Sequence, residues 1–230
     1  MRYGVPVYRI DQTAMDREVQ SILDLGVELR LNTPIGQEIT LQDLRDTHDA
    51  VFLGVGLMQG RLVDMEGIHL DGVMTAVDLL LNYNMGYQVD LGKRVVVVGG
   101  GDVAMDAART ALRLGQAKAE DLESETMHTA LDVARTALRL GVADVRMIAL
   151  ESWDELPASR FELEEAMEEG IELTPRLGPK RILGENGQVR ALEVIKVASV
   201  FDEHGRFNPE FISGSEHKLE IGRASCRERV

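Results

Sequence analysis

Apolar residues recur along this chain at two spacings, and each spacing predicts one kind of element. Apolar positions three or four residues apart indicate amphipathic helices, whereas alternation or a short apolar run indicates strands. The pattern predicts helices over residues 12–25, 41–45, 73–81, 103–114 and 159–169. It predicts strands over residues 27–31, 50–56, 94–98, 145–150, 171–174 and 217–220. Because strands and helices alternate through the middle of the chain, we expect an α/β protein with a parallel sheet.

Turn and cap residues support these boundaries. Thr13 and Gly26 are the expected caps of the first helix. Asn186-Gly187 lies between two alternating segments and is the strongest short signal for a two-residue β-hairpin. Residues 201–215 are polar and predict a long loop.

One stretch joins a strand to a helix through three glycines and reads Arg94-Val-Val-Val-Val-Gly-Gly-Gly-Asp-Val-Ala-Met-Asp106. As Gly99-x-Gly101-x-x-Ala104 it fits the dinucleotide fingerprint of a Rossmann-like domain. The first glycine permits the turn, the second lets a diphosphate approach, and the small third residue lets the helix pack on the strand. The alternative is a flexible glycine-rich connector, but four preceding β-branched residues favour a strand. The residues expected at the dinucleotide are Gly99, Gly100, Gly101, Asp102, Val103 and Ala104.

The helix after this turn contains a segment that the chain repeats. Residues 106–115 return almost unchanged at 132–141, an offset of 26 residues. One repetition does not make a solenoid, which needs about three units. We therefore expect a helical insertion over residues 116–141, with residues 116–124 as its exposed loop.

A dinucleotide unit needs an acidic residue about 20 positions after the glycines to accept the ribose hydroxyls. Glu151 lies 50 residues after Gly101, and removing the 26-residue repeat leaves 24. Glu151 is therefore the expected ribose ligand, with Ser152 beside it. A carboxylate there repels a 2′-phosphate and no arginine follows immediately, so NADH is favoured over NADPH. The alternative reading of Glu151 is a solvated loop glutamate.

A second glycine-rich strand end lies near the N-terminus. The apolar run over residues 50–56 ends in Gly54 and Gly56, where backbone could approach another ligand. A simple turn at the end of a strand explains these two glycines equally well.

Composition and charge exclude several classes of partner. Hydrophobic residues make up 44% and charged residues 28% of the chain, which is typical of a globular protein. The formal net charge of −14 argues against nucleic acid and anionic membranes as partners. No apolar run approaches the roughly 18 residues of a membrane span. No signal-peptide pattern follows Met1, so we expect a cytoplasmic location.

Residues 221–230 look like the translation of a sequencing-adapter read-through, and we expect this tail to be artefactual. The tail holds the only cysteine, Cys226, so we expect no disulfide, thiol nucleophile or Cys-ligated cluster elsewhere. The five histidines show no metal-ligand spacing, and no metal site is expected. The many glutamates of residues 159–169 are most simply a solvated helix face. No side chain is therefore assigned a catalytic role.

With these motifs in place, the chain resembles the glutamate synthase small-subunit-like oxidoreductases, which are also similar to the N-terminal region of dihydropyrimidine dehydrogenase. The resemblance covers nearly all of residues 1–220 and is carried by residues 3–9, 49–56, 60–61, 99–110 and 156–157. It implies a two-dinucleotide-binding-domain flavoprotein, in which an NAD(P)H-binding domain interrupts an FAD-binding domain. It also implies that hydride passes from the nicotinamide to FAD and on to a partner domain or subunit.

This resemblance predicts a partial FAD-binding domain and linker over residues 1–90 and an NAD(P)H-binding domain over residues 91–220. Family members carry an upstream G-x-G-x-x-G and a final strand that this sequence does not show, so we expect a fragment with an incomplete FAD site. One alternative is a nucleotide-binding module without turnover. Another is a methyltransferase that uses S-adenosylmethionine. A short-chain dehydrogenase is disfavoured because no Tyr-x-x-x-Lys occurs.

Overall fold

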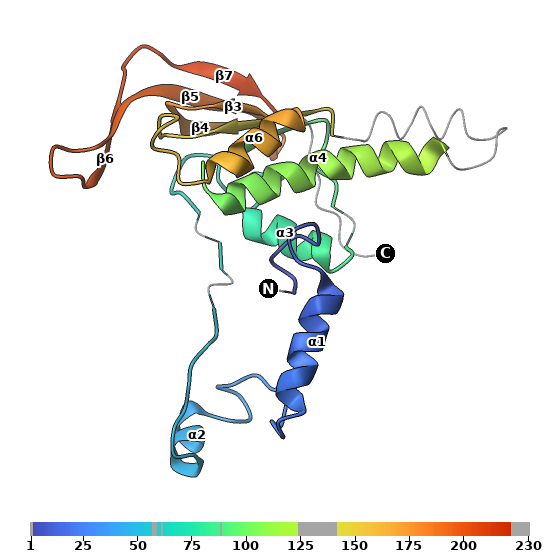
Figure 1. Cartoon of the computed structure of the whole chain (residues 1–230). Coiled ribbons are helices and arrows are strands. Elements are labelled where there is room, and N and C mark those ends of the chain that lie inside the picture. Colours follow the sequence, from blue (N-terminus) through green and yellow to red (C-terminus); the bar gives the residue numbers. More distant parts are fainter. Residues whose placement is uncertain (1, 57–58, 61, 88, 124–141, 222–230) are drawn as a thin grey trace. The chain divides into compact units, whose positions relative to one another are not determined.

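The computed structural model describes residues 2–56, 59–60, 62–87, 89–123 and 142–221. The chain divides into two compact units (Figure 1). The smaller unit comprises Val7–Gln59 together with Arg2, and the larger comprises Tyr3–Pro6 and the chain from Gly60 onward.

The smaller unit contains two helices, α1 (Gln12–Leu23) and α2 (Leu41–Thr47), close to their predicted places. The N-cap of α1 is Asp11 and not the expected Thr13. The Asp11 carboxylate accepts a hydrogen bond from the Thr13 backbone N–H at 2.8 Å, so Thr13 lies inside the first turn. A charged acceptor two positions earlier therefore takes the capping role.

The two strands predicted in this unit, over residues 27–31 and 50–56, are wrong. Neither segment is assigned to a strand, and their apolar side chains are largely exposed, with Phe52 at 94% and Val55 at 83%. An alternating pattern becomes a strand only where a neighbouring strand accepts its backbone hydrogen bonds. The part of the chain that the structure describes offers these segments no such neighbour.

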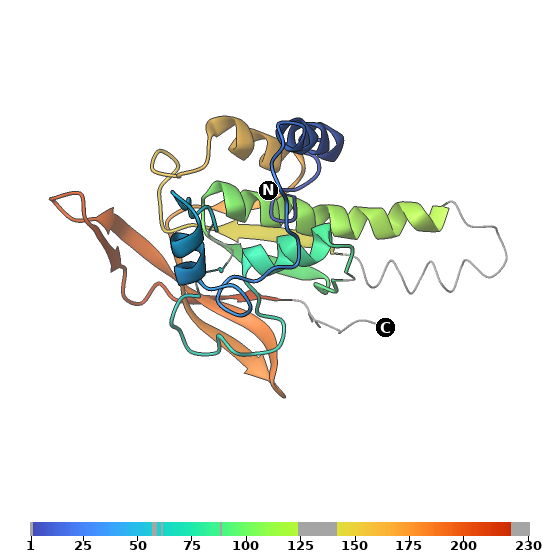
Figure 2. The same ribbon diagram turned by 90° about the horizontal axis from the view of Figure 1, so that it is seen from below.

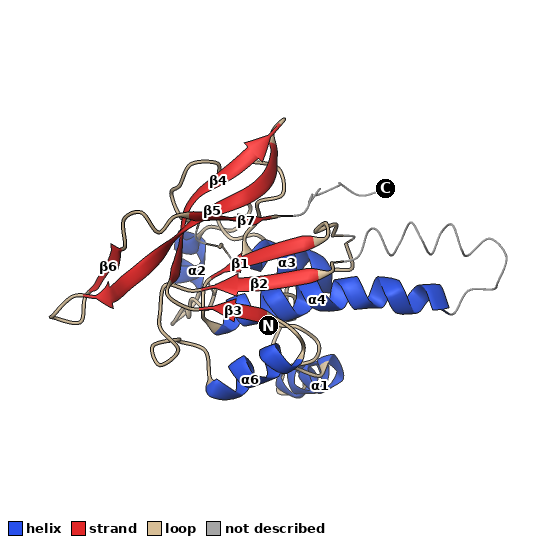
Figure 3. Cartoon of the chain, turned by 90° about the horizontal axis from the view of Figure 1, so that it is seen from above, coloured by secondary structure: helices blue, strands red, loops and turns tan. Residues whose placement is uncertain are grey.

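The larger unit is built on a three-stranded parallel sheet, which confirms the α/β expectation. Its strands β1 (Arg94–Val98), β2 (Asp144–Ile148) and β3 (Glu172–Thr174) lie in the order β1-β2-β3 (Figure 3). The register pairs Val98 with Ile148 and Ile148 with Thr174, so the three strands end at one edge. In a parallel sheet, this carboxyl edge is where ligands bind.

Three helices pack with one face of this sheet: α3 (Ala76–Asn84), α4 (Asp102–Glu123) and α6 (Arg160–Glu168). Alternation along β1 sends Val95 and Val97 toward this layer and Val96 toward the opposite one. Met105 of α4 and Met147 of β2 are completely buried between helices and sheet. This apolar layer holds the start of α4 firmly against the strands.

An antiparallel sheet covers the other face. It consists of β4 (Leu177–Glu185), β5 (Gln188–Phe201), β6 (Phe207–Phe211) and β7 (His217–Glu220), with β5 pairing all three others. The long β4–β5 hairpin is orange in Figure 2. Asn186 and Gly187 have φ values of 53° and 78°, as a type I′ turn requires, so the predicted hairpin is confirmed. The predicted loop over residues 201–215 is wrong in part, because β6 lies inside it and pairs with β5.

The predicted end of the crossover helix is also wrong. α4 continues past Gly115 to Glu123, so the loop expected over residues 116–124 is helical for most of its length. A glycine inside a helix costs only about 1 kcal/mol, which neighbouring helix-forming residues can offset. The second copy of the repeat, residues 132–141, lies outside the described residues.

Candidate dinucleotide site

The three glycines form a tight turn between β1 and α4 at the carboxyl edge of the parallel sheet. Gly99 has a φ of 131°, a conformation that side chains rarely adopt. Its N–H donates to the Ile148 carbonyl at 2.9 Å, which ties the turn to β2. A Cβ on Gly99 would lie 3.4 Å from the Ala104 Cβ, so helix and strand approach as closely as the fingerprint predicts.

Gly100 is covered by the loop that follows β2. A Cβ at this position would collide with the Leu156 side chain and lie 3.1 Å from the Ala149 Cβ. The Gly100 carbonyl accepts a hydrogen bond from the Ala158 N–H at 3.1 Å. Sequence reasoning missed this contact, because nothing local to Leu156 and Ala158 indicates that they fold back onto the turn.

Gly101 differs from Gly100 because no atom lies within 4 Å of the position that its Cβ would occupy. The Gly101 carbonyl accepts from the N–H groups of Ala104 and Met105, at 2.9 and 3.1 Å, and so opens the helix. Among the described residues, none accepts a hydrogen bond from the N–H groups of Gly101, Asp102 or Val103. Free N–H groups at a helix N-terminus beside open space fit a diphosphate.

Glu151 lies where an acid beside this turn was expected. It follows β2 by three residues, and its Oε2 is 3.7 Å from the position of a Cβ on Gly100. The carboxylate therefore lies beside the glycine turn and not away from it. A carboxylate beside a turn of this kind can accept hydrogen bonds from the hydroxyls of an adenosine ribose.

Ser152 is already engaged by a neighbouring carboxylate. Its N–H and its hydroxyl donate to Glu155 Oε2 at 2.9 and 2.8 Å. Arg176, which follows β3, brings its Nη2 to 3.0 Å from the same oxygen. These donors lower the pKa of the Glu155 carboxyl, first through the Ser152 N–H and hydroxyl and then through the Arg176 charge. Sequence reasoning considered an arginine only immediately after Glu151 and therefore missed Arg176, which follows the next strand, β3.

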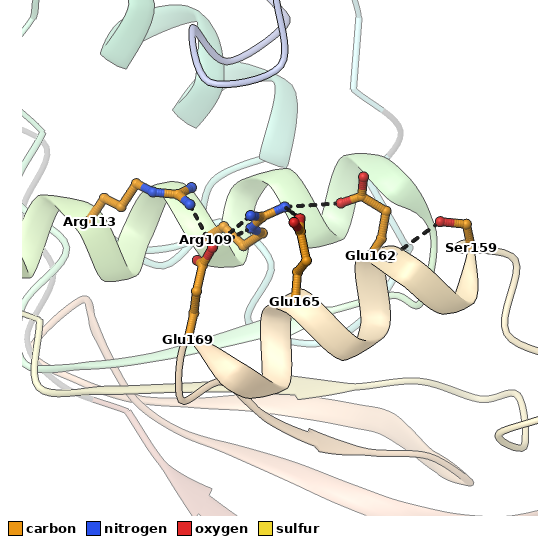
Figure 4. Close-up of polar contacts among 6 residues, drawn as sticks. All are labelled: Arg109, Arg113, Ser159, Glu162, Glu165 and Glu169. Atoms are coloured by element: carbon orange, nitrogen blue, oxygen red, sulfur yellow. Dashed lines mark hydrogen bonds and ion pairs between the residues drawn. The ribbon is translucent and has the colours of Figure 1, made fainter.

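Helix α6 anchors the loop that covers the turn, and its glutamates are not a simple solvated face. Arg109 of α4, whose side chain is only 7% exposed, forms ion pairs with three of them at 2.6 to 3.1 Å (Figure 4). These three glutamates are Glu162, Glu165 and Glu169. The Ser159 hydroxyl accepts from the Glu162 N–H at 3.3 Å and caps the helix. The loop is therefore held between the glycine turn and a fixed helix.

A pocket of about 630 Å³ opens beside the turn, along the edge of β1 that faces away from β2. Gly101, Asp102 and Val103 lie at one part of its wall. Most of the remaining wall is apolar and comes from β1, from residues 60 and 62–79 and from the antiparallel sheet. The part near the turn carries the free N–H groups of Gly101, Asp102 and Val103, which suit an anion.

The second pair of glycines lies in the smaller unit. Gly54 and Gly56 are both exposed, and Gly56 has a φ of 69°. A Cβ on Gly54 would meet only the Phe52 ring, at 3.1 Å. No atom lies within 4 Å of the position that a Cβ on Gly56 would occupy.

No helix in the described part of the chain is long and apolar enough to cross a membrane. Within the same residues, no group of three His, Cys, Asp or Glu side chains is arranged to hold a metal ion.

No family model matches the chain. Curated relatives do match it over 94% of its length. It is 31% identical to the glutamate synthase [NADPH] small chain of Halomonas elongata and covers 42% of that protein. It is 32% identical to the NADPH-Fe(3+) oxidoreductase subunit beta of Geobacter sulfurreducens and covers 29% of it. The chain therefore spans less than half the length of these relatives.

Among solved structures, FprA from Mycobacterium tuberculosis in complex with NADPH superposes with a TM-score of 0.75 at 18% identity. The match covers 96% of this chain and 59% of FprA. At this identity the likeness concerns the fold alone, and it confirms the α/β, two-dinucleotide-binding-domain class expected from the sequence. The curated relatives confirm the resemblance: over nearly its whole length, this chain is similar to part of the glutamate synthase small chain and of related oxidoreductase subunits.

Proposed function

We propose that this chain is the nicotinamide-dinucleotide-binding part of a flavin-dependent oxidoreductase. In the whole protein, the nicotinamide would give a hydride to FAD, and the electrons would pass on to a partner domain or subunit. The cofactors supply the redox chemistry, and the protein's role is to bind and orient them. No catalytic side chain is required by this proposal.

The observation that carries the proposal is that backbone N–H groups following one strand lie close to a carboxylate following the next. Free N–H groups of Gly101, Asp102 and Val103 face open space after β1, and the Glu151 carboxylate lies beside the same turn after β2. A diphosphate and an adenosine ribose need these two features side by side. Gly99, Gly100 and Ala104 act in this proposal by shaping the turn.

The assignment of residues 91–220 to dinucleotide binding and of residues 1–90 to part of an FAD domain remains a proposal. Relatives named as a small chain and as a subunit beta support an electron-accepting partner. The exposed apolar side chains around Phe52 and Val55 also support a further domain that packs against them. Gly54 and Gly56 remain candidate flavin neighbours in that larger assembly.

The proposal can be tested by dinucleotide binding to the full chain. Trp153, the only tryptophan, lies two residues from Glu151 and is 47% exposed, so its fluorescence should fall when a nicotinamide dinucleotide binds. We expect saturable quenching by NADH, NADPH or both, with calorimetry giving the dissociation constant. Gly101→Val should weaken binding by about tenfold or more, because a side chain would stand between the N–H groups and the diphosphate.

Gly4→Val is the matched control. Like Gly101, Gly4 has no atom within 4 Å of its Cβ position and no positive φ. The fold should therefore tolerate a valine equally well at either site. Equal loss of binding in both variants would contradict the proposed site. Lack of quenching and of calorimetric heat with either dinucleotide would refute the function.

The alternative is a binding module without turnover, and the observation that favours it is that Gly54 and Gly56, the candidate flavin neighbours, are both exposed. Adding FAD and NADH together separates the two hypotheses. If the chain accelerates the loss of flavin absorbance in the presence of NADH, it catalyses turnover. If the dinucleotide binds but the flavin absorbance does not fall, the chain is a binding module.

A further inference from the structure

One oxygen of the chain occupies an anion-binding position made by three donors. The Ser152 N–H, the Ser152 hydroxyl and the Arg176 guanidinium all converge on Glu155 Oε2, at 2.9, 2.8 and 3.0 Å. Backbone N–H, hydroxyl and arginine groups are the donors that proteins use for phosphate oxygens. The Glu155 carboxylate therefore stands where the oxygen of a phosphate group could stand.

The position of these donors relates them to the proposed dinucleotide. Ser152 directly follows Glu151, whose carboxylate lies beside the glycine turn. Arg176 also contacts Glu151, because the Arg176 backbone N–H donates a hydrogen bond to the Glu151 carbonyl at 2.9 Å. An adenosine ribose held by Glu151 would thus have the three donors next to its sugar hydroxyls. In NADPH, the 2′-hydroxyl at this place carries a phosphate.

Arg176 has an unusual backbone conformation, and one nitrogen of its guanidinium group has no hydrogen-bond partner among the described residues. Its φ of 55° lies in the left-handed region, which is uncommon for a residue other than glycine and is often found at binding sites. Its carbonyl accepts from the Val197 N–H at 3.0 Å, so β5 fixes the backbone on the other side. Its Nη1 is buried and has no hydrogen-bond partner among the described residues. A buried guanidinium nitrogen without a partner is costly, and a second phosphate oxygen would satisfy it.

We propose that Ser152 and Arg176 form a binding site for the 2′-phosphate of NADPH, and that the Glu155 carboxylate fills this site until the phosphate displaces it. This inference rests on the proposed function, because it places the adenosine ribose at Glu151. Glu155 can move without breaking the fold, since its side chain is 35% exposed and lies in a loop.

The inference changes the coenzyme preference expected from Glu151 alone. Glu151 favours the free hydroxyls of NADH, whereas Ser152 and Arg176 favour the phosphate of NADPH. Glu155 competes with the phosphate for the same donors, so its charge sets how strongly NADPH is preferred. The names of the relatives, an NADPH-dependent small chain and an NADPH-Fe(3+) oxidoreductase subunit, agree with this direction.

The test measures dissociation constants of NADPH and NADH for the full chain and for two variants. Arg176→Gln should weaken NADPH binding about tenfold or more, because it removes charge-assisted hydrogen bonds. It should leave NADH binding within about twofold, because NADH has no 2′-phosphate. Glu155→Gln should tighten NADPH binding about fivefold or more, because it removes the competing charge. Inorganic phosphate should compete weakly with NADPH and not with NADH.

Glu185→Gln and Arg190→Gln are the matched controls. These two residues form an ion pair of the same kind, with Nε and Oε2 3.4 Å apart, on the β4–β5 hairpin. Both controls should leave both dissociation constants unchanged. Equal changes for NADPH and NADH in the Arg176 and Glu155 variants would overturn the inference, since the residues would then only shape the loop. NADH binding with no NADPH binding in any variant would overturn it while the proposed function stands. If neither dinucleotide binds the unmodified chain, both proposals fail.

Discussion

Replacing Arg109 by methionine should strongly destabilise the larger unit and loosen the loop over the glycine turn. Methionine keeps much of the volume of the side chain but removes its charge. The contacts that are lost include those of Nη1 to Glu162 and Glu165, at 3.1 and 2.9 Å, and those of Nε and Nη2 to Glu169, at 3.0 and 2.6 Å. The three carboxylates would then face an apolar side chain.

The magnitude follows from how deeply each partner is buried. Removing one member of a buried ion pair costs about 3–5 kcal/mol, because the other charge is left uncompensated. Glu162 is only 13% exposed, but Glu165 is 36% exposed and water can solvate it. Arg113 also remains 2.7 Å from Glu169. We therefore expect the low end of the range, a loss of about 3 kcal/mol. For a chain of this size, that corresponds to a fall in melting temperature of roughly 6–12 °C.

Urea unfolding followed by circular dichroism measures this change directly. Glu162→Gln added to the Arg109→Met variant should restore part of the stability, because it neutralises the most deeply buried of the three carboxylates. Arg190→Met, which breaks the exposed pair with Glu185, should cost less than about 1 kcal/mol. A loss below about 1 kcal/mol for Arg109→Met would refute the reasoning, as would a double variant no more stable than the single one.

Three further outcomes can be checked with the same stability measurements. Gly100→Ala should cost roughly 1–3 kcal/mol, because its Cβ would collide with Leu156, and Leu156→Ala should relieve much of this cost. Gly187→Ala should cost about 1 kcal/mol, because alanine is strained at the φ of 78° in the hairpin turn; an unchanged unfolding midpoint would contradict this. The hydrogen bond from Arg181 lowers the pKa of Glu193 below 4.5. The stabilisation is therefore complete above pH 4.5 and is lost as the pH falls through the lowered value, and Glu193→Gln should remove this part of the acid dependence.

Local features of this protein could be predicted from residues close together in the chain. The turn at Gly99, the close approach of Ala104 and the hairpin at Asn186-Gly187 each depend on the conformation of a few neighbouring residues. Side-chain chemistry at those positions limits the backbone to a small set of angles, so a single sequence is sufficient. The placement of Glu151 beside the glycine turn also followed from spacing, because parallel strands bring their carboxyl ends to one edge.

Contacts between distant positions could not be read in this way. The segments over 27–31 and 50–56 alternate like strands but lack neighbours, whereas residues 207–211, within a stretch that reads as a loop, pair with β5. Leu156 folds onto Gly100, and Arg176 reaches Glu151 and Glu155 only because β3 lies next to β2. Such contacts depend on which strands pair and how the layers pack. That choice is made by the burial and hydrogen bonding of the whole chain, and no short stretch of residues contains it.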